Sequence, residues 1–293
     1  MTGHMLIGET LFDLDSELPL RWKPEEERFR WQGEPFRRRV RVTLHCAEAL
    51  PEWTEEELDR EDGLRVGRDA EGNAVRVYTA TFLAGWPVYA RSVCRDGGVT
   101  IDFVNAHSIW QNPNIRLWNL VHMERFLLEA DALVLHCSYL MIGGKAILFS
   151  APSGTGKTTQ AKLWEKLTPG RIINGDKAIV QKRGGTWYAC GYPFHGSAEE
   201  CENEDYPIAA IVVVRQSPED TIEPLRPMKR LTAVYSECTV NTWDADSISR
   251  ALNLVGELVT GVEVVCQHCT MNDEACHTLR RYLEERNLCN CTI

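Results

Sequence analysis

The sequence predicts an α/β (α+β) protein with two parts, a core that combines a mixed sheet with helices and a β-rich N-terminal domain. Two observations predict this class. Residues 151–159 form a glycine-rich segment between a strand pattern and a helix pattern, the order of a strand-loop-helix unit. Residues 1–105 instead carry short β-branched and aromatic runs separated by turn signals. We therefore expect an N-terminal domain over residues 1–105, a connecting helix within 106–131 and the core domain over 132–293.

The composition is that of an ordinary soluble globular protein, with 293 residues of which 44% are hydrophobic and 25% charged. A net charge of −10 argues against nucleic-acid binding, which usually needs a basic face, although it leaves room for a local basic pocket. Residues 1–10 show no signal-peptide pattern. The most apolar window, residues 132–151, is interrupted by His136, Gly143, Gly144 and Lys145. We expect a cytoplasmic protein with no membrane segment and with an oligomeric state that the sequence leaves open, a homo-oligomer included.

The N-terminal elements are predicted from short β-forming runs bounded by turns such as Asp96-Gly97-Gly98. Strands are expected at residues 38–45, 74–82, 86–92 and 99–104. The acidic stretch at residues 52–62 is expected to be a solvated helix or loop rather than a binding surface. Apolar residues at helical spacing over residues 114–130 then predict the helix that connects the two domains.

The strands that lead into the glycine-rich segment are expected to form a hairpin. Residues 133–140 and 146–150 have strand patterns and flank the tight-turn pair Gly143-Gly144. A helix at residues 157–167 and a strand at 171–174 follow, and Asp176 stands 19 positions after Lys157. Ordinary P-loop hydrolases instead place their strand-loop-helix unit inside a parallel sheet. This order therefore indicates a different kind of core.

Residues 151–159 read Ala-Pro-Ser-Gly-Thr-Gly-Lys-Thr-Thr, which fits a phosphate-binding loop except that Ala151 stands where the first glycine is usual. Glycines let the backbone curl so that successive N–H groups point at an anion, and the following helix adds its positive N-terminal end. Lys157 is placed to neutralise the β and γ phosphates of a nucleotide, and the Thr158 hydroxyl to bind Mg²⁺. The residues expected to contact the nucleotide are Ser153, Gly154, Thr155, Gly156, Lys157, Thr158 and Thr159.

These features resemble the HPr kinase/phosphorylase family and its distant relatives, the ATP-dependent phosphoenolpyruvate carboxykinases. Leu135-His136-Cys137 stands where that family has Leu-His-Gly, and His136 lies 15 positions before Ala151, as the family spacing requires. Asn174-Gly175-Asp176 matches the second member of the family's Asp-Asp pair. The resemblance covers residues 132–183 with specific motifs and continues to about residue 283 as a general layout. Residues 1–105 do not resemble the N-terminal domain of true HPr kinases.

The resemblance implies an HPr kinase-like core with a mixed sheet, ATP and Mg²⁺ as cofactors, and metal ligation by Thr158 and Asp176. It also places His136 beside the γ phosphate, where the ring would orient the attacking hydroxyl or take its proton. From the spacing alone, a hydrogen-bonded core histidine is the favoured interpretation of His136, and the family resemblance reverses that preference. The catalytic set is therefore expected to be His136, Lys157 and Asp176.

The departures from the family pattern bear on the substrate. Gly175 removes the carboxylate to which the family assigns proton transfer at the substrate hydroxyl, and Thr159 replaces an acidic residue common in HPr kinases. The family's basic signature for docking HPr is not found. The chain is more similar to HPr kinase-related proteins outside sugar regulation, some of which phosphorylate serine in peptide precursors. The partner expected is a protein or peptide with a hydroxyl acceptor.

The remaining core elements follow from local patterns. A second hairpin is expected at residues 178–182 and 186–189 across Gly184-Gly185, a buried strand at 208–214 and another at 262–266. Helices are expected at residues 247–259 and 273–286. His195, in the loop at residues 191–197, is a candidate for the substrate side of the cleft, and a turn with a surface histidine is the alternative. Arg226, Lys229 and Arg230 read as a solvated basic face or as phosphate contacts.

Eleven cysteines without a regular framework fit reduced, mostly buried thiols. The pair Cys266 and Cys269, with further candidate ligands downstream, also raises a zinc hypothesis. Against it, Cys266 lies in an apolar run and Cys276 falls inside an expected helix. The downstream candidates are Cys276, His277, Cys289 and Cys291.

Three functions remain open at this level. The first is an ATP- and Mg²⁺-dependent kinase for a hydroxyl of a protein or peptide, since phosphoryl transfer depends on positioning and charge neutralisation. The second is a small-molecule kinase or carboxykinase relative on the same scaffold, although no set of carboxylate-binding arginines is evident. The third is a non-catalytic nucleotide-binding regulator. Gly175 favours this last reading, and the set Lys157, Thr158 and Asp176 opposes it.

Overall fold

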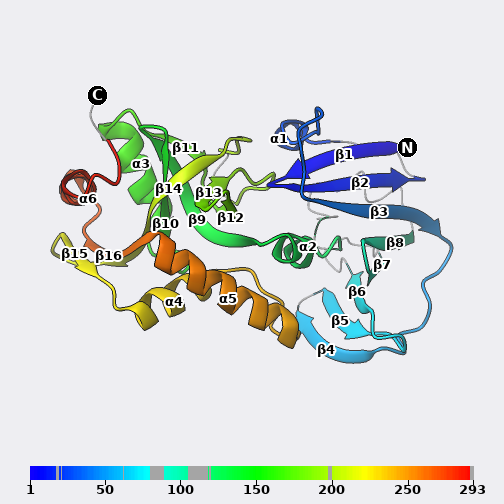
Figure 1. The fold of residues 1–293 in the computed structure, drawn as a ribbon. Helices are drawn as coiled ribbons and strands as arrows, with labels where there is room; N and C mark the ends of the chain where they lie inside the picture. The colour runs from blue at the N-terminus through cyan, green and yellow to red at the C-terminus, as the bar shows by residue number, and fades with distance from the viewer. Residues whose placement is uncertain are drawn as a thin grey trace. The chain divides into compact units, whose positions relative to one another are not determined.

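The computed structural model describes residues 1–17, 20, 22–61, 63–79, 89–104, 118, 120–196 and 200–290. The chain divides into two compact units, Met1–Phe126 and Leu127–Ile293, and helix α2 (Met123–Glu129) spans the division (Figure 1). Each unit is built on a large mixed sheet, which confirms the α+β class. Within the described ranges, no helix combines the length and apolar character needed to cross a membrane.

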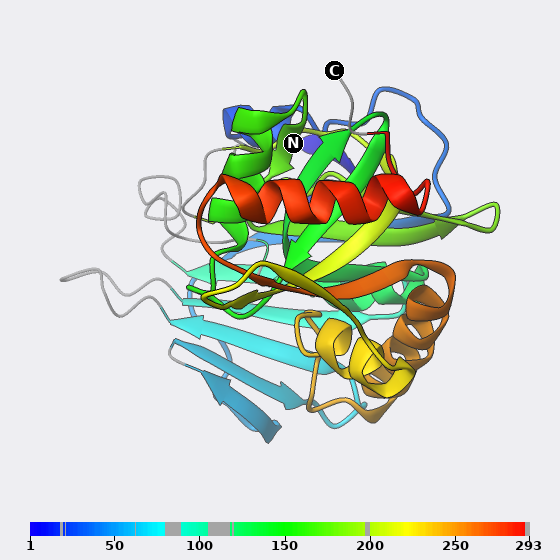
Figure 2. The ribbon, with the colours of Figure 1, turned by 90° about the vertical axis from the view of Figure 1, so that its left-hand side faces the viewer.

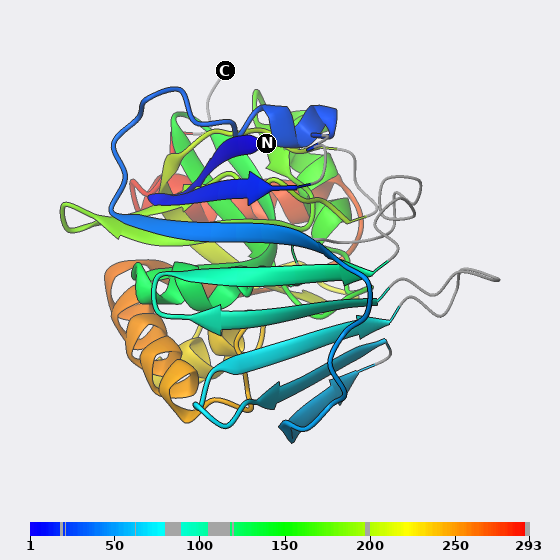
Figure 3. The ribbon, with the colours of Figure 1, turned by 90° about the vertical axis from the view of Figure 1, so that its right-hand side faces the viewer.

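The first unit holds an eight-stranded sheet in the order β1-β2-β3-β8-β7-β6-β5-β4 (Figure 3). The pairs β2–β3 and β3–β8 are parallel and the others are antiparallel. Alternate residues of β3 and β8 are buried, as expected of strands with one face on a core. The elements are β1 (Thr2–Ile7), β2 (Thr10–Ser16), α1 (Pro24–Glu27), β3 (Arg38–Ala47), β4 (Glu56–Glu61), β5 (Leu64–Arg68), β6 (Ala74–Thr79), β7 (Tyr89–Arg95) and β8 (Gly98–Val104).

Two expectations for the first half were wrong in part. The acidic stretch holds strand β4, which lies at the sheet edge, where charged side chains remain solvated and Glu57 pairs with Arg60 and Arg65 at 2.8 and 2.7 Å. The connecting helix begins only at Met123, because residues 120–122 form a turn that ends with His122 at a φ of 54°. Of the segment expected to be helical, residues 114–117 and 119 lie outside the described residues, as do residues 105–113 and residues 80–88 between β6 and β7.

Over its described residues, the second unit contains a second sheet and four helices of its own. The sheet order is β10-β9-β12-β13-β14-β16-β15, with β11 also paired to β9 and β10 also paired to β14. Only β10–β14 and β14–β16 are parallel. The elements are β9 (Ala132–Ile142), β10 (Lys145–Ser150), α3 (Lys157–Leu167), β11 (Arg171–Asn174), β12 (Lys177–Arg183), β13 (Thr186–Cys190), β14 (Tyr206–Gln216), β15 (Thr221–Pro224), α4 (Pro227–Tyr235), α5 (Ala245–Gly261), β16 (Glu263–Cys269) and α6 (Asp273–Glu285).

Both expected hairpins of this unit are confirmed. In the first turn Gly143 and Gly144 have φ of 56° and 72°, and in the second Gly184 and Gly185 have φ of 53° and 87°. Two-residue hairpin turns need positive φ at both positions, which glycine adopts without strain. The expected strands at residues 208–214 and 262–266 and the expected helices at 247–259 and 273–286 are also confirmed, with shifted ends. Helix α4 was not expected.

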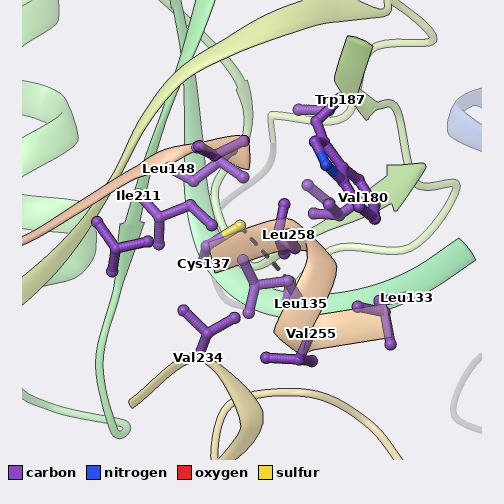
Figure 4. Close-up of a cluster of buried hydrophobic side chains, with 14 of the residues drawn as sticks. Leu133, Leu135, Cys137, Leu148, Val180, Trp187, Ile211, Val234, Val255 and Leu258 are labelled. Atoms are coloured by element: carbon purple, nitrogen blue, oxygen red, sulfur yellow. Dashed lines mark hydrogen bonds between the residues drawn. The ribbon is translucent and has the colours of Figure 1, made fainter. Parts of the chain in front are cut away.

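The sheet of the second unit is covered on both faces. Helices α3 and α6 lie on one face and α4 and α5 on the other (Figure 2). On the α3 side, Trp164 is fully buried and its ring lies 6.2 Å from that of Phe149. On the α5 side, Cys137, Leu148 and Leu258 belong to one buried apolar cluster (Figure 4). The loop after β10 and the loop between β11 and β12 both extend from this covered sheet.

Candidate active site

Strand β9 brings two loops together from opposite edges. On one edge Cys137 pairs with Ser150, the last residue of β10 before the glycine-rich loop. On the other edge β11 and β12 both pair with β9, and the chain between them leaves the ladder at Gly175 and Asp176. The backbone N–H of Cys137 donates to the Asp176 carbonyl at 3.0 Å, which holds this break against the strand. Cys137 is therefore a neighbour both of Ser150, where the glycine-rich loop begins, and of Asp176.

The glycine-rich loop connects β10 to α3, as the sequence predicts. Gly154 and Gly156 have φ of 78° and 113°, a region where residues with a Cβ are strained. A Cβ on Gly154 would point into open space, whereas one on Gly156 would collide with Met271. Gly156 is the N-cap of α3 and supplies no side-chain hydrogen bond to the helix. The first turn of α3 thus presents its N–H groups at an end that no cap side chain covers.

Lys157 is the first residue of α3 and lies beneath the loop. Lys157 is only 6% exposed, and its Nζ donates to the carbonyl oxygens of Ala151 at 2.7 Å and Pro152 at 3.3 Å. Burial lowers the pKa of Lys157, and the charges of Glu237 and Asp176 offset part of this effect. The Lys157 ammonium lies under the loop, whose residues 152–154 are exposed. It is therefore placed to face an anion that binds at this loop.

Asp176 lies beside a lysine and a histidine. Lys177 Nζ is 2.8 Å from one carboxylate oxygen and His136 Nε2 is 3.8 Å from the other. Burial by itself raises the pKa of Asp176, but the hydrogen bond from Lys177 and the charges of Lys177, His136 and Lys157 outweigh it, so the pKa lies below its usual range. The side chain is therefore an anion at neutral pH, and it is half-buried rather than sealed.

Asn174, which is fully buried, fixes the position of this break. Its Oδ1 accepts from the N–H groups of Asp176 and Lys177, both at 2.9 Å. Its Nδ2 donates to the carbonyls of Tyr192 and Phe194 at 3.0 and 3.1 Å. One amide side chain thus ties the loop at residues 191–196 to the loop that carries Asp176. The sequence pattern assigned Asn174 no such role.

The predicted substrate-side histidine lies in that tied loop. A Cβ on Gly196 would come within 2.9 Å of the Asp176 carboxylate, so the backbone at this point packs directly on Asp176. His195 is the preceding residue, and its Nδ1 lies 3.2 Å from the Gly196 carbonyl. The loop containing His195 therefore borders the acidic residue. Ser197, the last residue of the expected loop, lies outside the described residues.

His136 is held by a carboxylate that the sequence did not reveal. Its Nδ1 is 2.9 Å from Glu237 Oε2, and its backbone N–H donates to the Glu237 carbonyl at 2.9 Å. The Glu237 side chain is 10% exposed and that of His136 is 27% exposed, so the pair is shielded from water while the ring keeps an open edge. Glu237 follows α4 and stands 101 positions from His136, so no local pattern signals the pair.

Other predicted residues are placed as follows. Ser153 and Thr159 are exposed, and Thr155 and Thr158 are half-buried around the loop. Arg226 is the N-cap of α4, which carries Lys229 and Arg230. Arg226 is exposed. Lys229 Nζ lies 3.8 Å from Glu223, and Arg230 donates to the Leu225 carbonyl at 2.8 Å and lies 3.7 Å from Glu263.

The candidate zinc ligands, a hypothesis that the sequence raised but did not favour, are not brought together. Cys266 faces the α5 side of the sheet, whereas Cys269, Cys276 and Cys289 belong to the cluster on the α3 side. Residues three apart in a strand point to opposite faces, so a Cys-x-x-Cys pair within β16 does not form a chelate. Cys291 lies outside the described residues. Among the ten described cysteines, eight are buried, as expected of thiols that act as small apolar side chains.

Comparisons with known proteins give a distant likeness among solved structures. No protein-family model matches the chain, and no curated protein matches its sequence. Among solved structures, the chain is similar to the HPr(Ser) kinase/phosphatase from Coxiella burnetii, with a TM-score of 0.32 and 10% sequence identity. The match covers 53% of this chain and 98% of that chain. Because the likeness is this weak, the function is argued below from the geometry of the site.

Proposed function

We propose that the protein is an ATP- and Mg²⁺-dependent kinase that transfers the γ-phosphoryl group to a hydroxyl of a protein or peptide. The observation that carries the proposal is the meeting of three features at the middle of β9. These features are the loop with Lys157, the carboxylate of Asp176, and the hydrogen-bonded pair of His136 and Glu237. Phosphoryl transfer requires an anion cradle, a metal ligand and a group that positions the nucleophile, and each has a candidate here.

The residues present fit a nucleotide with Mg²⁺. Gly154 and Gly156 adopt the positive φ that a curled anion cradle needs, and the Lys157 ammonium already bonds to the loop carbonyls from below. Thr158 offers a hydroxyl and Asp176 a carboxylate, the oxygen ligands that Mg²⁺ prefers. When bound, Mg²⁺ would neutralise charge on the phosphates and orient them for in-line transfer. Lys177, hydrogen-bonded to Asp176, adds a second cation to this region.

His136 is proposed to act as the general base. Its Nδ1 faces Glu237, so the neutral ring that donates from Nδ1 keeps the Nε2 lone pair on the side of Asp176. The acceptor hydroxyl would pass its proton to this Nε2 as its oxygen attacks the γ phosphorus. The bond between the γ phosphorus and the oxygen that bridges it to the β phosphorus would break at the same time, and ADP would leave with that electron pair. Gly175 has no side chain to perform this step. A histidine oriented by a buried carboxylate is a common arrangement for general-base catalysis.

The test uses the purified chain, γ-labelled ATP and Mg²⁺ in a lysate of the cells that make the protein. We expect label on a discrete polypeptide, and no label with Lys157→Ala. Lys182→Ala is the matched control, because Lys182 is an exposed lysine of β12 that pairs with Glu257 at 3.0 Å. Label that appears only on a small metabolite would replace the proposed acceptor class. Turnover retained by a folded Lys157→Ala variant would refute the proposed site.

A further inference from the structure

A second group of metal-ligand side chains lies on the strand pair β15–β16. Glu223 of β15 stands directly opposite Cys266 of β16, and His268 follows two residues along the same strand. Residues two apart in a strand share a face, and directly opposed residues of paired strands share it as well. Register alone therefore brings Glu223, Cys266 and His268 to one side of the sheet.

The distances between the three ligand atoms suit one metal ion. Cys266 Sγ is 3.6 Å from His268 Nε2, and His268 Nε2 is 3.1 Å from Glu223 Oε2. All three atoms lie within 4.8 Å of one another. Tetrahedral Zn²⁺ binds sulfur at about 2.3 Å and nitrogen or carboxylate oxygen at about 2.0 Å, which places neighbouring ligand atoms roughly 3.3 to 3.6 Å apart. The group thus needs little rearrangement to enclose an ion.

We propose that Glu223, Cys266 and His268 bind a divalent transition-metal ion, with zinc as the best fit. Thiolate and imidazole are preferred by Zn²⁺ over Mg²⁺, so this site and the proposed nucleotide site would select different ions. One thiolate and one carboxylate balance the charge of the ion. Cys266 is buried, His268 is half-buried and Glu223 is exposed, so the ion would lie at the surface with its fourth position open to solvent.

Neighbouring cations shape the affinity. Lys229 Nζ lies 3.8 Å from the other Glu223 oxygen, and Arg215 stands opposite His268 on β14. Their charge opposes a bare cation and favours a site in which both anionic ligands bind directly. The ion would also join the edge strand β15 to β16. Because β15 leads directly into α4, after which Glu237 follows, metal binding would brace the segment that supplies the partner of His136.

The test is metal binding by the full-length chain, purified under reducing conditions without a chelator. We expect about one zinc ion per chain by elemental analysis after desalting, and a thiolate-to-cobalt absorption band when Co²⁺ replaces it. Addition of zinc to the stripped protein should raise Tm by about 5 °C. Cys266→Ser should abolish the cobalt band and the zinc-dependent rise in Tm.

Cys269→Ser is the matched control, since Cys269 lies on the opposite face of the same strand and should leave zinc content unchanged. His268→Asn changes a half-buried surface residue and repeats the test if Cys266→Ser fails to fold. No zinc bound to the unmodified chain would overturn the proposal. The same holds for a zinc content that Cys266→Ser and His268→Asn leave intact. Each readout is independent of kinase activity, so failure of the proposed function would not affect the result.

Discussion

Replacing Glu237 by glutamine tests the proposed base without removing it. Glutamine has nearly the same shape, and the backbone hydrogen bond between the Glu237 carbonyl and the His136 N–H does not involve the side chain. What is lost is the negative charge 2.9 Å from His136 Nδ1. That charge is proposed to hold the ring with Nε2 toward the acceptor and to stabilise the cationic ring formed when the proton arrives.

The expected loss follows from the geometry of this pair. A hydrogen bond to a charged partner contributes about 1.5 to 3 kcal/mol, and both side chains here are largely shielded from water. If that contribution acts in the transition state, kcat falls by a factor of about 10 to 100, since each 1.4 kcal/mol changes a rate tenfold. The Kd for ATP should change little, because Glu237 is not among the residues proposed to contact the nucleotide.

The assay is steady-state phosphorylation of the acceptor identified by labelling, with the Kd for ATP measured separately. Glu257→Gln is the control, because Glu257 forms an exposed ion pair with Lys182 on the same unit and should keep full kcat. His136→Ala should reduce kcat at least as much as Glu237→Gln. A Glu237→Gln variant with unchanged kcat, alongside a strongly impaired His136→Ala, would refute the role given to Glu237. Full activity in both variants would refute His136 as the base.

Two further predictions concern other residues. Asp176→Asn removes the charged metal ligand while keeping its size, so Mg²⁺-dependent ATP binding should weaken by about tenfold or more, measured by calorimetry with and without Mg²⁺; unchanged affinity would place the metal elsewhere. His122 is fully buried, which lowers its pKa well below 6.5, with help from the charges of Arg76 and Arg125. Because the unfolded histidine takes up a proton that the folded one does not, the free energy of unfolding should fall by about 1.4 kcal/mol per pH unit below about pH 6.5. His122→Asn, which tolerates the φ of 54°, should remove this part of the slope in denaturant titrations from about pH 7.5 to about pH 5.5, and an unchanged slope would contradict the assignment.

The parts of the fold that could be predicted depend on local chemistry. The glycine pairs at positions 143–144 and 184–185 adopt the positive φ that two-residue hairpin turns need, so these pairs predict two hairpins. The helical repeat of α5 was visible because its buried residues recur at spacings of three and four. Strand β4 was missed for the converse reason. Its charged residues carry no apolar alternation, and only pairing with β5 makes the segment a strand.

The sequence by itself predicted where the glycine-rich loop lies between a strand and a helix, because Gly154, Gly156, Lys157 and Thr158 stand at fixed spacing in the chain. Phosphate binding by this loop stays a prediction. The sequence also marked His136 and Asp176 as candidates. Only the tertiary structure decided that these residues meet, since their approach depends on which edges of β9 carry β10 and β12.

Long-range contacts also decided which partners complete the two sites. Glu237 reaches His136 from 101 positions away, and Glu223 reaches His268 from 45 positions away. The sequence raised a zinc site at Cys266 and Cys269 without favouring it, and the structure does not support that pair, because residues at odd spacing in a strand point to opposite faces of the sheet. Side chains that act through pairing register and packing leave no local pattern, so their roles become visible only once the sheet is formed.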